Sequence, residues 1–275
     1  MERQLDHATA SLIMKTMPTQ PKMHLYLAVV LGALAALISQ APARWVAYAI
    51  GQASHKTVLL KDPQGTIWQG SAQAVLAGGA DNSNSMTTLP SRLQWTFAPS
   101  LTQWRLSLQL SLHSACCTPS PLVLHLTPSL SELKISVDNH RSEWPAQWLV
   151  GLGAPWNTIQ PQGTLVLQTQ DFAWLSQSNR VQGQFNITLQ NFSTQLSTLR
   201  PLGSYTIRLL PGASPSFDLS TSEGGLQLQG HGEWRQNKLH FLGEAFASEG
   251  SEYAVSNLLN VLGQRQGNKA LLKME

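Results

Sequence analysis

The chain has 275 residues, of which 12% are charged, and its formal net charge is +3 at pH 7. The charged share is low for a globular protein, and no basic cluster is interleaved with aromatic residues, so nucleic-acid binding has little support. Two cysteines are too few for a disulfide-based scaffold.

The first element is an uninterrupted apolar run at residues 25–38. With the uncharged residues around it, the run predicts a transmembrane helix at 24–41, because a span needs roughly 20 mostly apolar residues. Trp45 and Tyr48 follow where aromatic side chains favour a membrane interface. A cleaved signal peptide is the main alternative, since Ala41-Pro42-Ala43 resembles a cleavage site. A buried helix of an ordinary domain is a third interpretation.

The predicted organisation is a cytoplasmic tail at residues 1–23, the transmembrane helix, and a translocated domain at residues 42–275. Cations before and after the apolar run nearly balance, so charge says little about orientation. Long domains are translocated regardless of such charges. The domain, with about 230 residues, is large enough to bury a core.

Alternation of apolar and polar residues recurs through this domain. Residues 105–113 place four leucines on one face, with Ser and Gln opposite, which is typical of a half-buried strand. Turns rich in Pro and Gly separate such segments, and residues 77–88 are expected to form a flexible loop. Further strands are predicted at 66–75, 92–97, 122–126, 133–137, 164–168, 181–189, 205–210, 226–229, 233–234 and 239–244.

Two short helices are expected among these strands. One follows Ser142 as its N-cap and ends at Gly151 or Gly153, and the other covers residues 252–262, before Gly263. The predicted fold is therefore all-β, mainly antiparallel, with a curved or sandwich-like sheet and two short helices after one N-terminal transmembrane helix.

A similar order of strands recurs within the domain. Strand-like segments follow Gly65-Thr66 and again follow Gly163-Thr164. This predicts two similar β-units at about 56–140 and 155–250.

The motifs of common enzymes are missing from the sequence. It contains no Gly-x-Ser-x-Gly, no His-Glu-x-x-His, no phosphate loop and no Cys-x-x-Cys. His231 and His240 lack a nearby Cys or acidic partner at the spacing of metal ligands. We therefore expect no catalytic residues, no cofactor-binding residues, no metal site, and a protein that is not an enzyme.

The two cysteines are adjacent, at Cys116 and Cys117. Neighbours on a strand point to opposite faces, and a bridge between them closes a strained eight-membered ring, so two unpaired residues are the favoured interpretation. A vicinal disulfide or an intermolecular bridge is the alternative in an oxidising compartment.

Tryptophan is abundant, with nine residues in the chain. Packing on a sheet is favoured over a platform for carbohydrate or lipid, because the candidates lie in or beside strands. These candidates are Trp68, Trp95, Trp104, Trp174 and Trp234.

Six segments in order resemble the protein N family of the bacterial type II, or general, secretion pathway. They are APARWV (41–46), GTIWQG (65–70), WPAQWL (144–149), LRPLGSY (199–205), GLQLQGHG (225–232) and LLNVLG (258–263). The resemblance implies an uncleaved single-pass anchor in the inner membrane of a Gram-negative bacterium, a periplasmic β-domain, and no catalytic residues. The adjacent cysteines and the long leading tail depart from the family pattern.

The predicted function is that of an inner-membrane accessory of type II secretion. It acts through protein–protein contacts of the periplasmic domain during export of folded proteins, with other inner-membrane proteins of the machinery and the outer-membrane secretin as expected partners. The alternative is a membrane-anchored, lipid-handling β-sheet module. The leucine-lined face at 106–112 favours that alternative, and the discriminating observation is whether helices cover it.

Overall fold

A computed structural model describes residues 22–78, 85–102, 105–129, 131–235 and 238–274. The chain divides into two compact units, Met1–Gln40 and Ala41–Glu275. The predicted tail at residues 1–23 lies almost wholly outside the described residues.

The described part of the first unit is the helix α1 (Lys22–Ser39), which has 18 residues. At a rise of 1.5 Å per residue it extends for about 27 Å, against roughly 30 Å for the hydrocarbon core of a bilayer. Among the helices of the described residues, none combines the length and apolarity that a membrane crossing requires. The prediction of a transmembrane helix at 24–41 is therefore wrong.

The second unit is built on antiparallel strands, as the alternation of apolar and polar residues predicts. The strands are β1 (Val58–Gly65), β2 (Gln69–Ala77), β3 (Met86–Thr88), β4 (Leu93–Thr102), β5 (Arg105–Ser114), β6 (Leu122–Pro128), β7 (Leu133–Val137), β8 (His140–Pro145), β9 (Gln162–Leu175), β10 (Arg180–Ser193), β11 (Gly203–Leu210), β12 (Ser216–Gly224), β13 (Leu226–Arg235), β14 (Lys238–Ala247), β15 (Gln264–Gln266) and β16 (Lys269–Met274).

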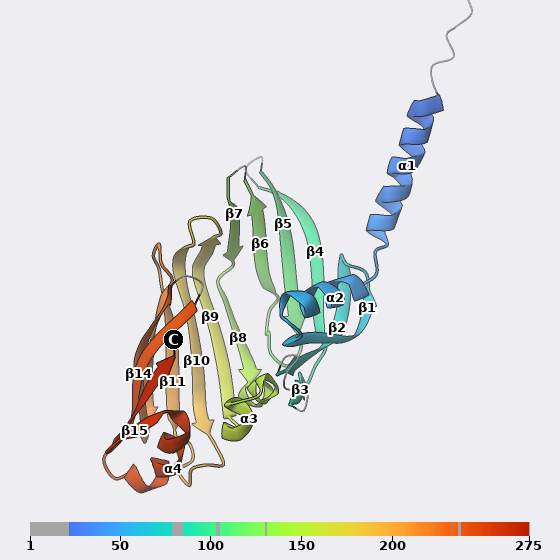
Figure 1. Ribbon diagram of the computed structural model, residues 1–275. Coiled ribbons are helices and arrows are strands. Elements are labelled where there is room, and N and C mark those ends of the chain that lie inside the picture. Colours follow the sequence, from blue (N-terminus) through green and yellow to red (C-terminus); the bar gives the residue numbers. More distant parts are fainter. Residues whose placement is uncertain (1–21, 79–84, 103–104, 130, 236–237, 275) are drawn as a thin grey trace, which may run out of the picture. The chain divides into compact units, whose positions relative to one another are not determined.

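In the described part of the chain these strands form one hydrogen-bonded sheet. Its order is β1-β2-β4-β5-β6-β7-β9-β10-β11-β12-β13-β14-β16-β15, with β3 beside β2 and β8 beside β9. Figure 1 shows β9, β10 and β11 as long, neighbouring strands. Hydrogen bonds between β7 and β9 join the two segments proposed as similar β-units, and their similarity stays a prediction.

The helices of this unit differ in part from those expected. The helix α4 (Glu252–Leu262) is confirmed with its predicted bounds. Ser142, expected as an N-cap, lies instead within β8, and the 3-10 helix η1 (Ala146–Leu152) begins only after Pro145. The helices α2 (Arg44–Ala53) and α3 (Trp156–Ile159) were not predicted.

Two clusters of buried side chains form the core. One gathers around Trp95 and Leu89, with residues of α2 such as Ile50 packed against it. The other gathers around Leu202 and Leu226 and includes Leu258 of α4. In Figure 1 α2 lies against β1 and α4 lies close to β15.

Candidate functional site

One face of the sheet carries apolar side chains in rows that cross the strands. Leu108 of β5 lies opposite Leu126 of β6. Leu126 lies opposite Ile135 of β7, which lies opposite Trp174 of β9. A parallel row runs through Leu110, Leu124, Val137 and Phe172. Because alternate residues of a strand share a face, both rows lie on the same side of the sheet.

The second row continues across an irregularity in the β9–β10 pairing. The register shifts between Gln182 and Gln184, and Asp171 has a positive φ of 49°. The ring of Phe172 nevertheless lies 5.6 Å from the ring of Phe185 on β10. The bulge therefore keeps the apolar row on one side of the sheet, although it interrupts strict alternation.

The row then continues over four more strands, β11 to β14. Phe185 lies opposite Leu209 of β11, and Leu209 lies opposite Phe217 of β12. Phe217 stacks on Phe241 of β14 at 5.7 Å between ring centroids. We use the name apolar face for the residues of these two rows together with the residues two positions before and after them on the same strands. The apolar face thus extends from β5 to β14.

Coverage of the apolar face changes along the leucine-lined strand β5. Leu110 and Leu112 pack against the cluster around Trp95, whereas Leu106, at the other end, is 65% exposed. Leu108, Leu124, Leu126 and Ile135 are half-buried. The face at 106–112 is therefore covered at one end and open to solvent at the other.

A cavity of about 250 Å³ adjoins the apolar face near α4. Ile187, Ile207 and Leu219, from β10, β11 and β12, form its floor, and Trp156 and Ile159 of α3 contribute to its wall. Leu262 of α4 also lines it. The side chains come from residues 149 to 262, so no local sequence pattern could have predicted this cavity.

Tyr205 lines the cavity, and its hydroxyl is already bonded. It donates a hydrogen bond to the carbonyl oxygen of Leu226 at 3.1 Å. Burial raises the pKa of this phenol well above its usual value. The phenol therefore stays protonated and contributes no charge to the cavity.

The opposite face of the sheet is polar. His231 of β13 and Asp218 of β12 lie opposite each other, with Nδ1 and Oδ1 2.7 Å apart. The spacing of residues in the sequence does not reveal this acidic partner, because the register of two strands brings Asp218 to His231. In the residues that the structure describes, no three His, Cys, Asp or Glu side chains gather into a metal-binding group.

A polar pocket on β8, β9 and β10 holds a second histidine. His140, Arg141 and Asn186 are among its lining residues. Among the residues that the structure describes, the Nε2 atom of His140 and the Oδ1 atom of Asn186 have no hydrogen-bond partner. Desolvation by burial lowers the pKa of His140, so the neutral imidazole is favoured.

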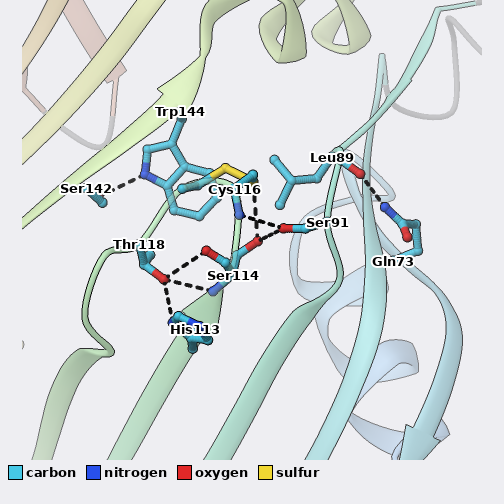
Figure 2. Close-up of a disulfide and its surroundings, with 10 residues drawn as sticks. Gln73, Leu89, Ser91, His113, Ser114, Cys116, Thr118, Ser142 and Trp144 are labelled. Carbon is cyan, nitrogen blue, oxygen red and sulfur yellow. Dashed lines mark hydrogen bonds between the residues drawn. A yellow bond between two sulfur atoms is a disulfide. The ribbon is translucent and has the colours of Figure 1, made fainter.

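The turn after β5 contains the adjacent cysteines. Their Sγ atoms are joined in a disulfide (Figure 2). The structure thus has the vicinal disulfide that the sequence offered as the alternative, and not the favoured pair of unpaired cysteines. The N–H of Cys116 donates to Oγ of Ser91 at 3.0 Å, and Ser91 Oγ lies 2.7 Å from Oγ of Ser114. The carbonyl of Cys117 accepts the N–H of Glu143 at 2.8 Å. The turn thus connects the segment before β4, the end of β5 and strand β8.

The two cysteines differ in exposure. Cys116 is exposed, whereas Cys117 is 3% exposed and belongs to the core cluster around Trp95. Trp144 and Trp148, stacked at 5.6 Å, pack against the same cluster. Figure 2 shows Trp144 beside the disulfide, with its indole N–H directed to Ser142.

The tryptophans proposed to pack on the sheet have different environments. Trp95 is 3% exposed, and its indole N–H donates to the carbonyl of Ile67. Trp174 is half-buried on the apolar face, and Trp234 is 40% exposed and tilted against Phe217. Trp104 lies outside the described residues. Packing on the sheet therefore accounts for Trp95 best.

Comparison with known proteins gives one match. The model of a family described as type II secretion system (T2SS), protein N, matches residues 56–271. No curated protein and no solved structure matches the chain. The matched residues cover β1 to β15 completely, and with them the apolar face, the cavity and the disulfide turn.

Proposed function

Because the chain belongs to the type II secretion system protein N family, we propose that it acts through protein–protein contacts of its β-sheet unit in the periplasm. The family makes it a component of the type II secretion system. In the proposal it is an accessory in the export of folded proteins across the outer membrane. Its partners are other inner-membrane proteins of the machinery and the outer-membrane secretin.

The disulfide supports the periplasmic location. Bonded cysteines are rare where thioredoxin and glutathione keep thiols reduced, and they persist in the bacterial periplasm. Cys116 and Cys117 are joined in the structure. A component whose cysteines are bonded fits the oxidising side of the envelope.

The outer edge of β1 is the observation that carries the proposal of a contact surface. Leu59, Leu60 and Lys61 pair with β2 on one side, and within the described residues no strand pairs with β1 on the other side. Unpaired backbone N–H and C=O groups at a sheet edge are a template for an added strand. Extended segments of partner proteins bind at such edges by strand addition.

The helix α2 fixes the start of this edge. Oγ of Ser54, just after α2, accepts the N–H of Val58 at 3.1 Å and donates to the carbonyl of Ile50 at 2.7 Å. A side-chain carbon of Leu59 lies 3.9 Å from the position that a Cβ would take at Gly51, so Leu59 lies close to α2. The edge is therefore held in place before a partner arrives, which lowers the entropic cost of binding.

Crosslinking in living cells tests the proposal. The full chain, tagged at its C-terminus and produced with the complete machinery, is crosslinked with formaldehyde and purified under denaturing conditions. We expect the secretin or an inner-membrane component to co-purify. Recovery of neither, when the same treatment captures contacts between other components, would contradict the proposal.

A further inference from the structure

The cavity beside α3 and α4 has the properties of a site for a hydrocarbon chain. Its floor is formed by Ile187, Ile207 and Leu219, which lie opposite one another on three neighbouring strands. Side chains of α3 and α4 complete its wall. We propose that this cavity binds a single acyl chain of a fatty acid or lipid.

The polar groups around the cavity exclude other classes of ligand. The hydroxyl of Tyr205 already donates to the carbonyl of Leu226, and β10, β11 and β12 pair with neighbouring strands on both sides. A sugar or a peptide placed here would leave its polar groups without hydrogen-bond partners, which is strongly unfavourable. A hydrocarbon chain has no such groups.

The volume of the cavity is enough for several methylene groups in a row. An engineered apolar cavity of about 150 Å³ binds benzene, and this cavity has a volume of about 250 Å³.

The apolar face provides a path for the part of a chain that extends beyond the cavity. Ile207 lines the cavity, and Leu209, two residues further along β11, lies on the same side of the sheet. Leu209 lies between Phe185 and Phe217 on the neighbouring strands, and all three are half-buried. An acyl chain leaving the cavity therefore remains against apolar side chains, with its polar head group near solvent.

Direct binding of fatty acids tests the proposal. The full-chain protein is titrated with cis-parinaric acid, a fluorescent fatty acid, and excitation transfer from tryptophan is recorded. Saturated fatty acids of increasing length then displace the probe. Affinity is expected to rise about fourfold for each added methylene until the cavity is filled. Absence of probe binding, or displacement that does not depend on chain length, overturns the proposal.

Two substitutions on neighbouring residues locate the site. Ile207→Phe fills the cavity and is expected to weaken probe binding at least tenfold. Arg208→Phe adds the same ring on the opposite face, where Arg208 is exposed, and is expected to leave binding unchanged. Leu219→Phe serves the same purpose if Ile207→Phe does not fold, as judged by circular dichroism. Equal binding by a folded cavity-filling variant and by Arg208→Phe overturns the proposal.

Native mass spectrometry distinguishes the sources of the chain. A bound mass equal to a fatty acid identifies a free acid, and a mass equal to a phospholipid identifies a membrane lipid; either result supports the site. Protein that carries no lipid and binds no probe overturns it. The proposed role in secretion is tested by crosslinking to other components, and the outcome of that experiment does not depend on lipid binding.

Discussion

The rings of Phe217 and Phe241 stack at 5.7 Å, although they belong to β12 and β14 and a third strand lies between them. They meet over Gly232 of β13, which pairs with both residues. A Cβ at Gly232 would lie 2.3 Å from the ring of Phe217. Glycine at this position therefore lets two aromatic rings close over a strand and continue the apolar face.

Gly232→Ala is expected to destabilise the protein by about 1 to 3 kcal/mol, because the new methyl group forces Phe217 out of its position. Gly212→Ala is the control, since the nearest atom to a Cβ there is 3.8 Å away. The control is expected to change stability by less than about 0.5 kcal/mol. Urea unfolding of both variants measures the difference. Equal midpoints would contradict the described packing of Phe217.

Tyr205→Phe is expected to cost about 1 to 2 kcal/mol, because the carbonyl of Leu226 loses the hydrogen bond from the phenol. Tyr253→Phe is a matched control, since Tyr253 is 93% exposed. Thermal unfolding of the two variants gives the comparison. A loss of stability in Tyr253→Phe as large as in Tyr205→Phe would argue against this role of the hydroxyl.

The cysteines are expected to respond unequally to substitution. Cys116→Ser and Cys117→Ser both break the disulfide, but only the second places a hydroxyl in the core around Trp95. Cys117→Ser is therefore expected to be less stable than Cys116→Ser by about 1 to 3 kcal/mol. The thermal midpoints of the purified variants measure this. Alkylation of both thiols in unreduced wild-type protein would instead show that the cysteines are unpaired.

The lowered pKa of His140 predicts that the stability of the protein depends on pH. Its pKa is lowered in the folded protein by desolvation, so the unfolded chain binds the proton more readily below the ordinary value of about 6.5. The unfolded state is then favoured as the pH falls through that value, and stability decreases. In His140→Asn this part of the decrease is expected to disappear. Thermal midpoints of the wild type and of His140→Asn at pH 7.5 and 5.5 check this prediction. An identical pH dependence of the two midpoints would contradict it.

The sequence predicted the parts of the fold in which local pattern and tertiary packing agree. The leucines of residues 105–113 alternate without interruption, and β5 covers Arg105–Ser114. In α4, Val255, Leu258 and Leu259 are spaced for one helix face and are all buried. Each of these patterns lies within one strand or helix, so the spacing of its apolar residues alone identifies the type of element.

Predictions failed where the structure depends on segments that are distant in the sequence, or on the exact length of a helix. Strand β1 contains Asp62 and Pro63, which are unusual in strands, and its pairing with β2 depends on the register. The cavity and the pair of His231 with Asp218 arise from neighbouring strands. The apolar run at 25–38 was interpreted as a membrane span from its composition, but α1 ends at Ser39, with 18 residues.

Site-specific photocrosslinking tests the central claim most directly, namely that this sheet works by contact with other components of the secretion system. A benzophenone amino acid replaces Lys61, which is exposed on the β1 edge, or Arg208, which is exposed on β11 in the middle of the sheet. In cells that make the complete machinery, we predict crosslinks from position 61 to a secretin or inner-membrane component and none from position 208. Crosslinks from position 208 but not from position 61 would contradict the account of the β1 edge.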